Sequence, residues 1–158
     1  MNQLKGKNMN HQPTSHRTVV EHLLGKYLVC AGEIDMFITM SQSFFTGKKV
    51  SNTWLDKSLA EKLKWYNVNL DPNIGEHATL LSLLNIFDTT HRLFRNTLAH
   101  SALSLDETGS FNVLAANGST NPIPIQELQT RVNDLIKLKD DINEALPLAY
   151  SASNKPTN

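Results

Sequence analysis

The stretch LLSLLNIFDTTHRLFRNTLAHS, residues 80–101, decides the fold that the sequence predicts. At about 100° per residue its larger apolar side chains fall within one narrow arc, which is the buried stripe of an amphipathic helix. The stripe consists of Leu80, Leu83, Leu84, Phe87, Phe94 and Leu98. Ile86 and Leu93 form a second apolar pair on another side of this helix, which is expected over about 76–101. We therefore expect one apolar face to pack inside the subunit and the other to pack against a separate partner, such as a second copy of the chain.

The same spacing of apolar residues predicts three further helices. The first covers residues 17–45 and is closed by Gly47. The second covers 51–68 and is opened by Ser51, and the last covers 125–146 and is stopped by Pro147. Between the last two of the four helices, residues 102–105 and 111–114 alternate in polarity around the turn sequence DETG. Alternation with a period of two predicts a β-hairpin there.

These elements predict an all-α fold, an up-and-down four-helix bundle with a β-hairpin insertion between the third and fourth helices. The bundle is expected to form one domain over 17–149, because 158 residues are one domain's length. The polar tails 1–16 and 150–158 are expected to be disordered.

Composition excludes several classes of function. The 15 basic residues equal the 15 acidic ones, so no overall field attracts nucleic acid or an anionic membrane. The single cysteine, Cys30, rules out a disulfide framework and fits a reducing cytoplasm. The chain shows no run that suits a membrane span, no recognisable metal-ligand spacing and no cofactor motif. We therefore expect a cytoplasmic protein with no metal and no cofactor.

The end of the long helix carries three residues suited to phosphate chemistry, Arg95, Asn96 and His100. A histidine can move protons near neutral pH, and the negative end of a helix dipole favours its acid form. The planar guanidinium of arginine fits two phosphate oxygens, and an amide can orient either group. On a straight helix Arg95 and His100 point about 140° apart, and a symmetric dimer would bring such groups together by supplying the second group from across the interface.

Spacing alone does not single out this motif, because Arg17 and His22 in RTVVEH have the same separation. Context separates the two, since His100 ends a helix and Arg95 is followed by a polar residue. Structural roles stay open beside the functional ones. Arg95 has Asp88 and His91 as candidate partners, and His100 is also suited to capping the helix end.

Two further groups have both a structural and a functional interpretation. His91 lies on the apolar face, where a core histidine with a hydrogen-bond partner is the more common case. Glu33 and Asp35 have the chemistry of an acidic corner of an active site, but a solvated helix face is the more common explanation of such residues.

With Arg95, a polar residue and then His100, the stretch RNTLAHS resembles the R-polar-x-x-x-H signature of the HEPN superfamily. The layout from about Arg17 to Ala149 is similar to that family's small helical bundles. The resemblance implies a homodimer whose motif helices meet, and in active members a metal-independent endoribonuclease. Ser101 departs from the closest variants of the motif, which often have glycine after the histidine.

The resemblance makes Arg95, Asn96 and His100 the candidate catalytic residues, with His91 and Ser101 as candidate binding residues. The expected function is cleavage of RNA by attack of its own 2′-hydroxyl, in a toxin or defence effector that an inhibitory protein partner restrains. The alternative is a non-catalytic module that binds RNA, a nucleotide or a protein.

Overall fold

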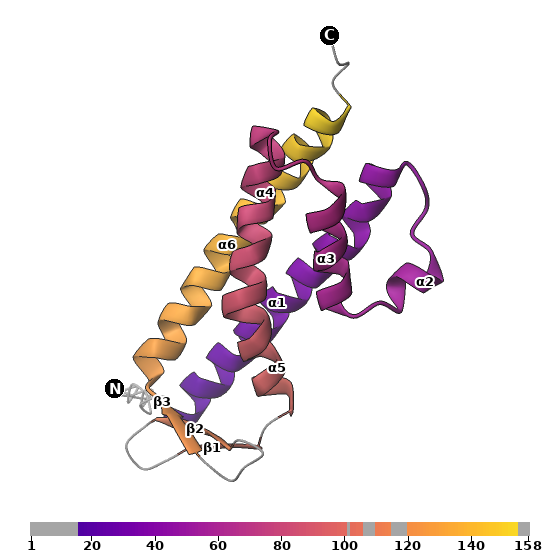
Figure 1. Cartoon of the computed structure of the whole chain (residues 1–158). Coiled ribbons are helices and arrows are strands. Elements are labelled where there is room, and N and C mark those ends of the chain that lie inside the picture. The colour runs from indigo at the N-terminus through magenta and orange to yellow at the C-terminus, as the bar shows by residue number, and fades with distance from the viewer. Residues whose placement is uncertain (1–15, 101, 106–109, 115–119, 155–158) are drawn as a thin grey trace, which may run out of the picture.

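The computed structural model describes residues 16–100, 102–105, 110–114 and 120–154 (Figure 1). Its α-helices are α1 (His16–Thr46), α2 (Asn52–Leu55), α3 (Leu59–Asn69), α4 (Gly75–Ile86), α5 (Leu93–His100) and α6 (Ile125–Ser153). A π-helix, η1 (Phe87–Arg92), joins α4 to α5, and the strands are β1 (Ala102–Leu105), β2 (Phe111–Leu114) and β3 (Thr120–Ile123). The protein is therefore a helical bundle with a small sheet at one end, as the sequence predicts in outline.

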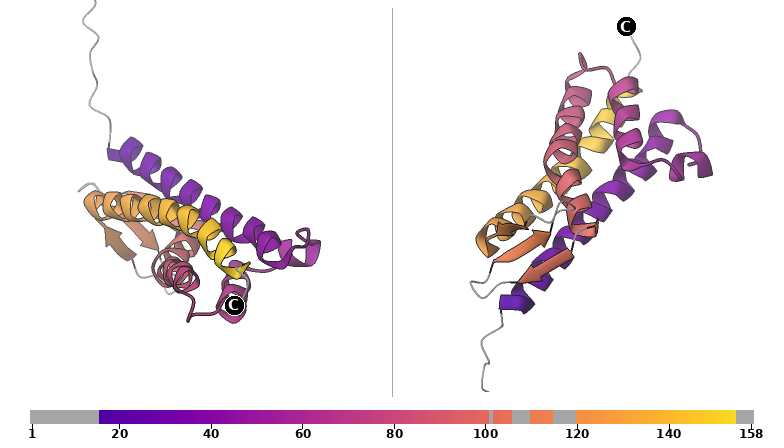
Figure 2. Two further views of the ribbon diagram at one scale, coloured as in Figure 1. Left: turned by 90° about the horizontal axis from the view of Figure 1, so that it is seen from above. Right: turned by 60° about the horizontal axis from the view of Figure 1, so that its bottom comes forward.

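The core lies between the two long helices α1 and α6 and the rod formed by α4, η1 and α5 (Figures 1 and 2). Each predicted apolar stripe supplies fully buried side chains, such as Tyr27 and Ile34 from α1 and Val132 and Ile142 from α6. In the rod, Leu80, Leu84, Phe87 and Leu98 are buried, while Leu83 and Phe94 are half-buried. The stripe in residues 80–98 is thus confirmed.

The helices do not alternate in direction as an up-and-down bundle requires. His77 near the start of α4 bonds Ala149 near the end of α6, whereas Phe94 in α5 stacks on Arg131 near the start of α6. The rod is therefore antiparallel to α6, while α1, α3 and α6 run the same way (Figure 1). The loops around α2 carry the chain back along the bundle before α3 begins.

The second predicted helix, 51–68, is in fact two helices. Ser51 caps α2 through a bond from the Trp54 amide to its hydroxyl, 3.2 Å long. Ser58 then starts α3 with a capping box, in which its hydroxyl accepts from the Glu61 amide and the Glu61 carboxylate accepts from the Ser58 amide. A second strong cap inside the stretch explains the break, because such a residue favours a new helix start.

The predicted hairpin is present as β1 and β2, which pair antiparallel with Leu103 opposite Val113. Its expected turn, 106–109, lies outside the described residues. A third strand, β3, which was not among the predicted elements, pairs with β2. Pro122 lacks an amide hydrogen, so the local sequence argues against a strand. An edge strand nevertheless tolerates proline, because one side of it needs no hydrogen-bond partner.

The last helix continues beyond its predicted stop at Pro147 and ends at Ser153. Pro147 lies on the exposed side, while Ala145, Ala149 and Ala152 extend the buried face past it. Packing of that face outweighs the hydrogen bond that proline cannot make. Residues 150–153 are therefore helical rather than a tail. Residues 155–158 and 1–15 lie outside the described residues, and α1 begins at His16.

Candidate functional site

The motif residues lie on α5, at the end of the bundle that carries the sheet (Figure 1). Arg95 and Asn96 are half-buried, and Nη1 of Arg95 donates to Oδ1 of Asn96 at 3.2 Å. His100 is the last residue of α5 and is exposed. Ser101, the predicted binding residue next to it, lies outside the described residues. The structure thus brings Arg95 and Asn96 together and leaves the His100 ring open to solvent.

One face of α5 is available to a partner. Leu93, Asn96, Thr97 and His100 are spaced three and four residues apart, which places them on the same side of an α-helix. Leu93 is 56% exposed, and Thr97 and His100 are exposed as well. Arg95 lies about 140° from His100 on this helix, so the two side chains leave it in different directions. A single α5 therefore does not aim both groups at one phosphate.

The candidate structural partners of Arg95 are engaged elsewhere. Asp88 forms an ion pair with Arg92, four residues on, and His91 bonds to Tyr27. Within the described part of the chain, the Arg95 guanidinium has only its neighbour Asn96 as a side-chain hydrogen-bond partner. Similarly, no described residue hydrogen-bonds to the His100 ring, so the capping role is not observed. Apart from the Arg95–Asn96 bond, neither side chain is committed to a hydrogen bond or ion pair within the part of the chain that the structure describes.

His91 belongs to the core rather than to this open face. It is 3% exposed, and its Nδ1 lies 2.9 Å from the Tyr27 hydroxyl. Burial lowers its pKa, with Arg131 acting in the same direction and Asp134 acting against it. The neutral ring follows from this environment. The position of His91 therefore does not support the prediction that it is a binding residue. It supports the interpretation of His91 as a core histidine with a hydrogen-bond partner.

The π-helix η1 directly precedes the motif and was not predicted. In a π-helix each amide donates a hydrogen bond to the carbonyl five residues back. This places an extra residue in the turn and rotates every side chain beyond it relative to a regular α-helix. Its residues Phe87 and His91 are both buried. Such turns occur frequently at functional sites. The orientation of α5 relative to α4 is therefore set by η1 and not by a uniform helical period.

Aromatic packing holds α5 against α1 and α6. The Phe94 ring meets the Tyr27 ring edge-on at 5.1 Å between centroids. The Arg131 guanidinium lies over the Phe94 ring, with its Cζ 4.6 Å from the ring centroid. Arg131 also pairs with Glu127 at 2.7 Å. Arg131 is thus a second cation close to α5, and nothing in its local sequence distinguishes it from an ordinary helix-surface arginine.

The acidic residues of α1 are committed to ion pairs. Glu33 pairs with Lys139 at 3.2 Å, and Asp35 lies 3.6 Å from the buried Lys62 ammonium. They therefore stabilise contacts between helices and do not form an acidic corner beside α5. In the described residues no group of three or more histidine, cysteine or acidic side chains is placed to hold a metal ion. Nor is any described helix long and apolar enough to cross a membrane.

Comparisons with protein-family models, with curated proteins and with solved structures find no significant match to this chain. The class that its fold defines is a helical bundle with a three-stranded antiparallel sheet. The side chains that give its candidate site a chemistry are Arg95, Asn96 and His100.

Proposed function

We propose that this protein is a HEPN-type, metal-independent endoribonuclease. The observation that carries the proposal is that one short helix presents a half-buried Arg95, which donates a hydrogen bond to Asn96, and an exposed His100 at its end. Ribonuclease chemistry needs a group that moves protons and a cation that does not lose its proton, and these two side chains supply them.

In the proposed reaction His100 exchanges protons with the reacting oxygens. One histidine removes the proton from the 2′-hydroxyl, which attacks the adjacent phosphorus, and a protonated histidine gives a proton to the departing 5′-oxygen. Arg95 stabilises the negative charge on the phosphate oxygens through its two-pronged guanidinium. Asn96 already accepts a hydrogen bond from Arg95, so its role is to hold that guanidinium in place.

Two copies of the chain are part of the proposal. Because Arg95 and His100 diverge on one helix, the base, the acid and the phosphate cation need groups from two α5 helices. The exposed Leu93 supplies an apolar contact for such a meeting on the same face as Asn96 and His100. An enzyme of this kind in a cell needs restraint, so we include a toxin or defence role with an inhibitory protein partner.

Incubation of the purified chain with mixed RNA in the presence of a metal chelator tests the proposal. We expect cleavage that leaves 2′,3′-cyclic phosphate ends, reduced about 100-fold or more in both Arg95→Ala and His100→Ala. The matched controls are Arg17→Ala and His22→Ala, which have the same sequence spacing at the exposed start of α1 and should cleave like wild type. Circular dichroism shows that each variant is folded.

The divergence of Arg95 and His100 also favours a second function, a module that binds RNA or a nucleotide without cutting it. A folded dimer that binds RNA through Arg95 and produces no cyclic phosphate ends would support this alternative against the nuclease. A chain that stays monomeric at high concentration would contradict the proposed two-chain site.

A further inference from the structure

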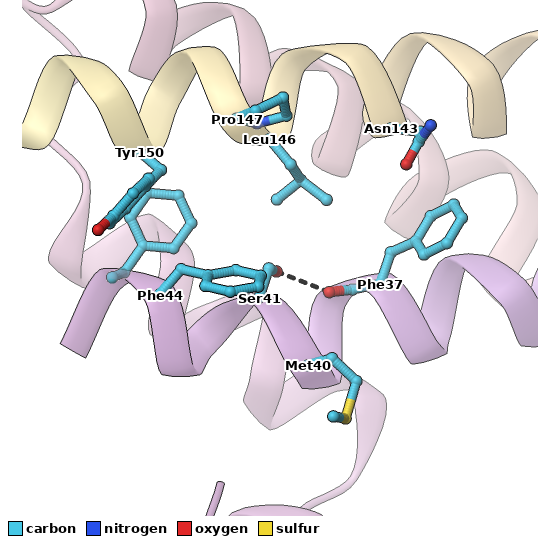
Figure 3. Close-up of a pocket in the computed structure, with 9 residues that line it drawn as sticks. Phe37, Met40, Ser41, Phe44, Asn143, Leu146, Pro147 and Tyr150 are labelled. Carbon is cyan, nitrogen blue, oxygen red and sulfur yellow. Dashed lines mark hydrogen bonds between the residues drawn. The ribbon is translucent and has the colours of Figure 1, made fainter. Parts of the chain in front are cut away.

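A cavity of about 580 Å³ opens between the C-terminal halves of α1 and α6, at the end of the bundle away from α5 (Figure 3). Apolar side chains supply most of its wall, namely Phe37, Met40, Phe44, Phe45, Leu146 and Tyr150. Leu146 points from α6 into the space between the helices, with Phe37 and Tyr150 toward opposite ends (Figure 3). A volume of this size lies in the range of sites for small organic ligands.

The aromatic side chains at one end of the cavity pack against one another but stay exposed to solvent. The Tyr150 ring lies 6.1 Å from both the Phe44 and Phe45 rings, yet Phe44 is 62% exposed and Tyr150 is 40% exposed. Met40, also on this wall, is 51% exposed. A hollow lined by exposed large apolar groups is where an apolar ligand gains most from leaving water.

The cavity offers few free polar groups. The Ser41 hydroxyl donates to the Phe37 carbonyl at 2.6 Å and lies 2.6 Å from the Tyr66 hydroxyl, so its bonding is satisfied. Asn143 contributes its side-chain amide. The backbone carbonyl of Asn143 receives no helical hydrogen bond from Pro147, because proline has no amide hydrogen. A nucleobase would leave several of its own polar edge atoms unpaired here, which is costly. An apolar ligand body fits better.

A basic rim adjoins this cavity. A second hollow shares Met40, Phe44 and Tyr150 with it and is also lined by Lys48 and Lys49. These lysines directly follow Gly47, whose positive φ of 65° ends α1. Both are exposed, and neither has an ion-pair partner among the described residues. A ligand whose body lies among the aromatic rings could therefore reach the Lys48 and Lys49 ammonium groups with an anionic head.

We propose that this cavity binds a small amphipathic anion, with an acyl or aryl body between α1 and α6 and a carboxylate, sulfonate or phosphate at Lys48 and Lys49. The site is independent of the α5 motif, because no motif residue lines either hollow. The apolar wall sets the body of the ligand, and the rim sets its charge.

Calorimetric titration of the full chain tests the site with decanoate, with anilinonaphthalene sulfonate and with their uncharged counterparts decanol and phenylnaphthylamine. We expect one-to-one binding of the anions, about tenfold tighter than that of the neutral partners. The two anions distinguish an acyl from an aryl source. Adenosine monophosphate, which has the charge but a polar base, should bind more weakly than decanoate.

Variants separate the rim from the wall. The double change Lys48→Gln and Lys49→Gln should weaken anion binding about tenfold and leave neutral binding unchanged. The charge-matched control is Lys26→Gln with Lys64→Gln, which alters exposed lysines away from both hollows. Phe44→Ala, an exposed position that should not affect folding, should weaken both kinds of ligand. The proposal is overturned if no probe binds saturably, if both double variants behave alike, or if adenosine monophosphate binds best.

Discussion

The Tyr27 hydroxyl lies 2.9 Å from Nδ1 of His91 and 3.3 Å from the His91 backbone oxygen, joining α1 to the π-helix η1. Both side chains are buried, and 64 residues separate them in the chain. Because η1 directly precedes α5, this contact ties the orientation of the motif helix to α1. The pair is therefore a structural support for Arg95 and His100 rather than a part of their chemistry.

Removing the Tyr27 hydroxyl should destabilise the fold. Tyr27→Phe keeps the ring against Phe94 but leaves polar atoms of His91 without their buried partner, which costs about 1–2 kcal/mol of unfolding free energy. Urea unfolding measures the loss. Tyr150→Phe removes an exposed hydroxyl and is the matched control, expected within about 0.5 kcal/mol of wild type. Equal effects of the two changes would show that the Tyr27 contact contributes nothing.

Acidification should weaken the fold through His91. Burial lowers the pKa of this imidazole in the folded protein, so below about pH 6.5 the unfolded chain binds a proton at His91 more strongly than the folded chain does. Stability from this group is therefore full above that pH and is lost as the pH falls, by at most about 1.4 kcal/mol per pH unit.

The test compares unfolding free energies between pH 7.5 and pH 5.5. His91→Gln should show a shallower loss of stability on acidification than wild type, whatever its absolute stability. His22→Gln, which changes an exposed histidine on α1, should keep the wild-type slope. An unchanged slope in His91→Gln would mean that His91 titrates alike in the folded and unfolded states.

The parts of the fold that sequence could predict are those governed by apolar spacing. The stripes through Tyr27 in α1 and Val132 in α6 follow a regular period, and burial of these residues confirms it. At two prolines, the local preference against strand or helix did not decide the structure. Pro122 pairs in an edge strand and Pro147 continues a helix, because neighbouring elements supply the packing that the local sequence does not reveal.

The candidate site was only partly predictable for a related reason. The motif residues could be found by their chemistry, and their functional role stays a prediction. The partner of His91 could not be found, because Tyr27 lies 64 residues away in the chain. The Asp88–Arg92 ion pair has the ordinary spacing of four residues on a helix and was not among the predicted contacts. Arg131 was missed since its contact with Phe94 exists only after α5 and α6 pack together.

The buried ammonium of Lys62 depends on Asp35. Its Nζ lies 3.6 Å from the Asp35 carboxylate and donates to the Thr39 hydroxyl at 2.9 Å. Asp35→Asn removes the opposite charge and leaves a desolvated cation, which should cost about 1–3 kcal/mol, since Asp35 itself is partly exposed. Glu33→Gln is the control, because Glu33 forms a more exposed pair with Lys139 and should cost less than about 1 kcal/mol.

Lys62→Met separates charge from packing at the same position. An apolar side chain of similar length needs no counter-charge, so this variant should be close to wild type in urea unfolding. Combined with Asp35→Asn it should cost less than Asp35→Asn alone. A double variant as unstable as the sum of the single ones would show that the two groups do not interact.

Replacing Pro147 should stabilise the protein, because α6 already runs through it. Pro147→Ala supplies an amide that can bond to the Asn143 carbonyl and removes the ring from an exposed position of a helix interior. Proline also restricts the unfolded chain, which offsets part of the gain. The net increase in unfolding free energy should be about 1–2 kcal/mol. Ser151→Ala, an exposed change one turn later, should shift it by less than about 0.5 kcal/mol. A loss of stability in Pro147→Ala would mean that α6 needs the proline geometry to pack its last turns.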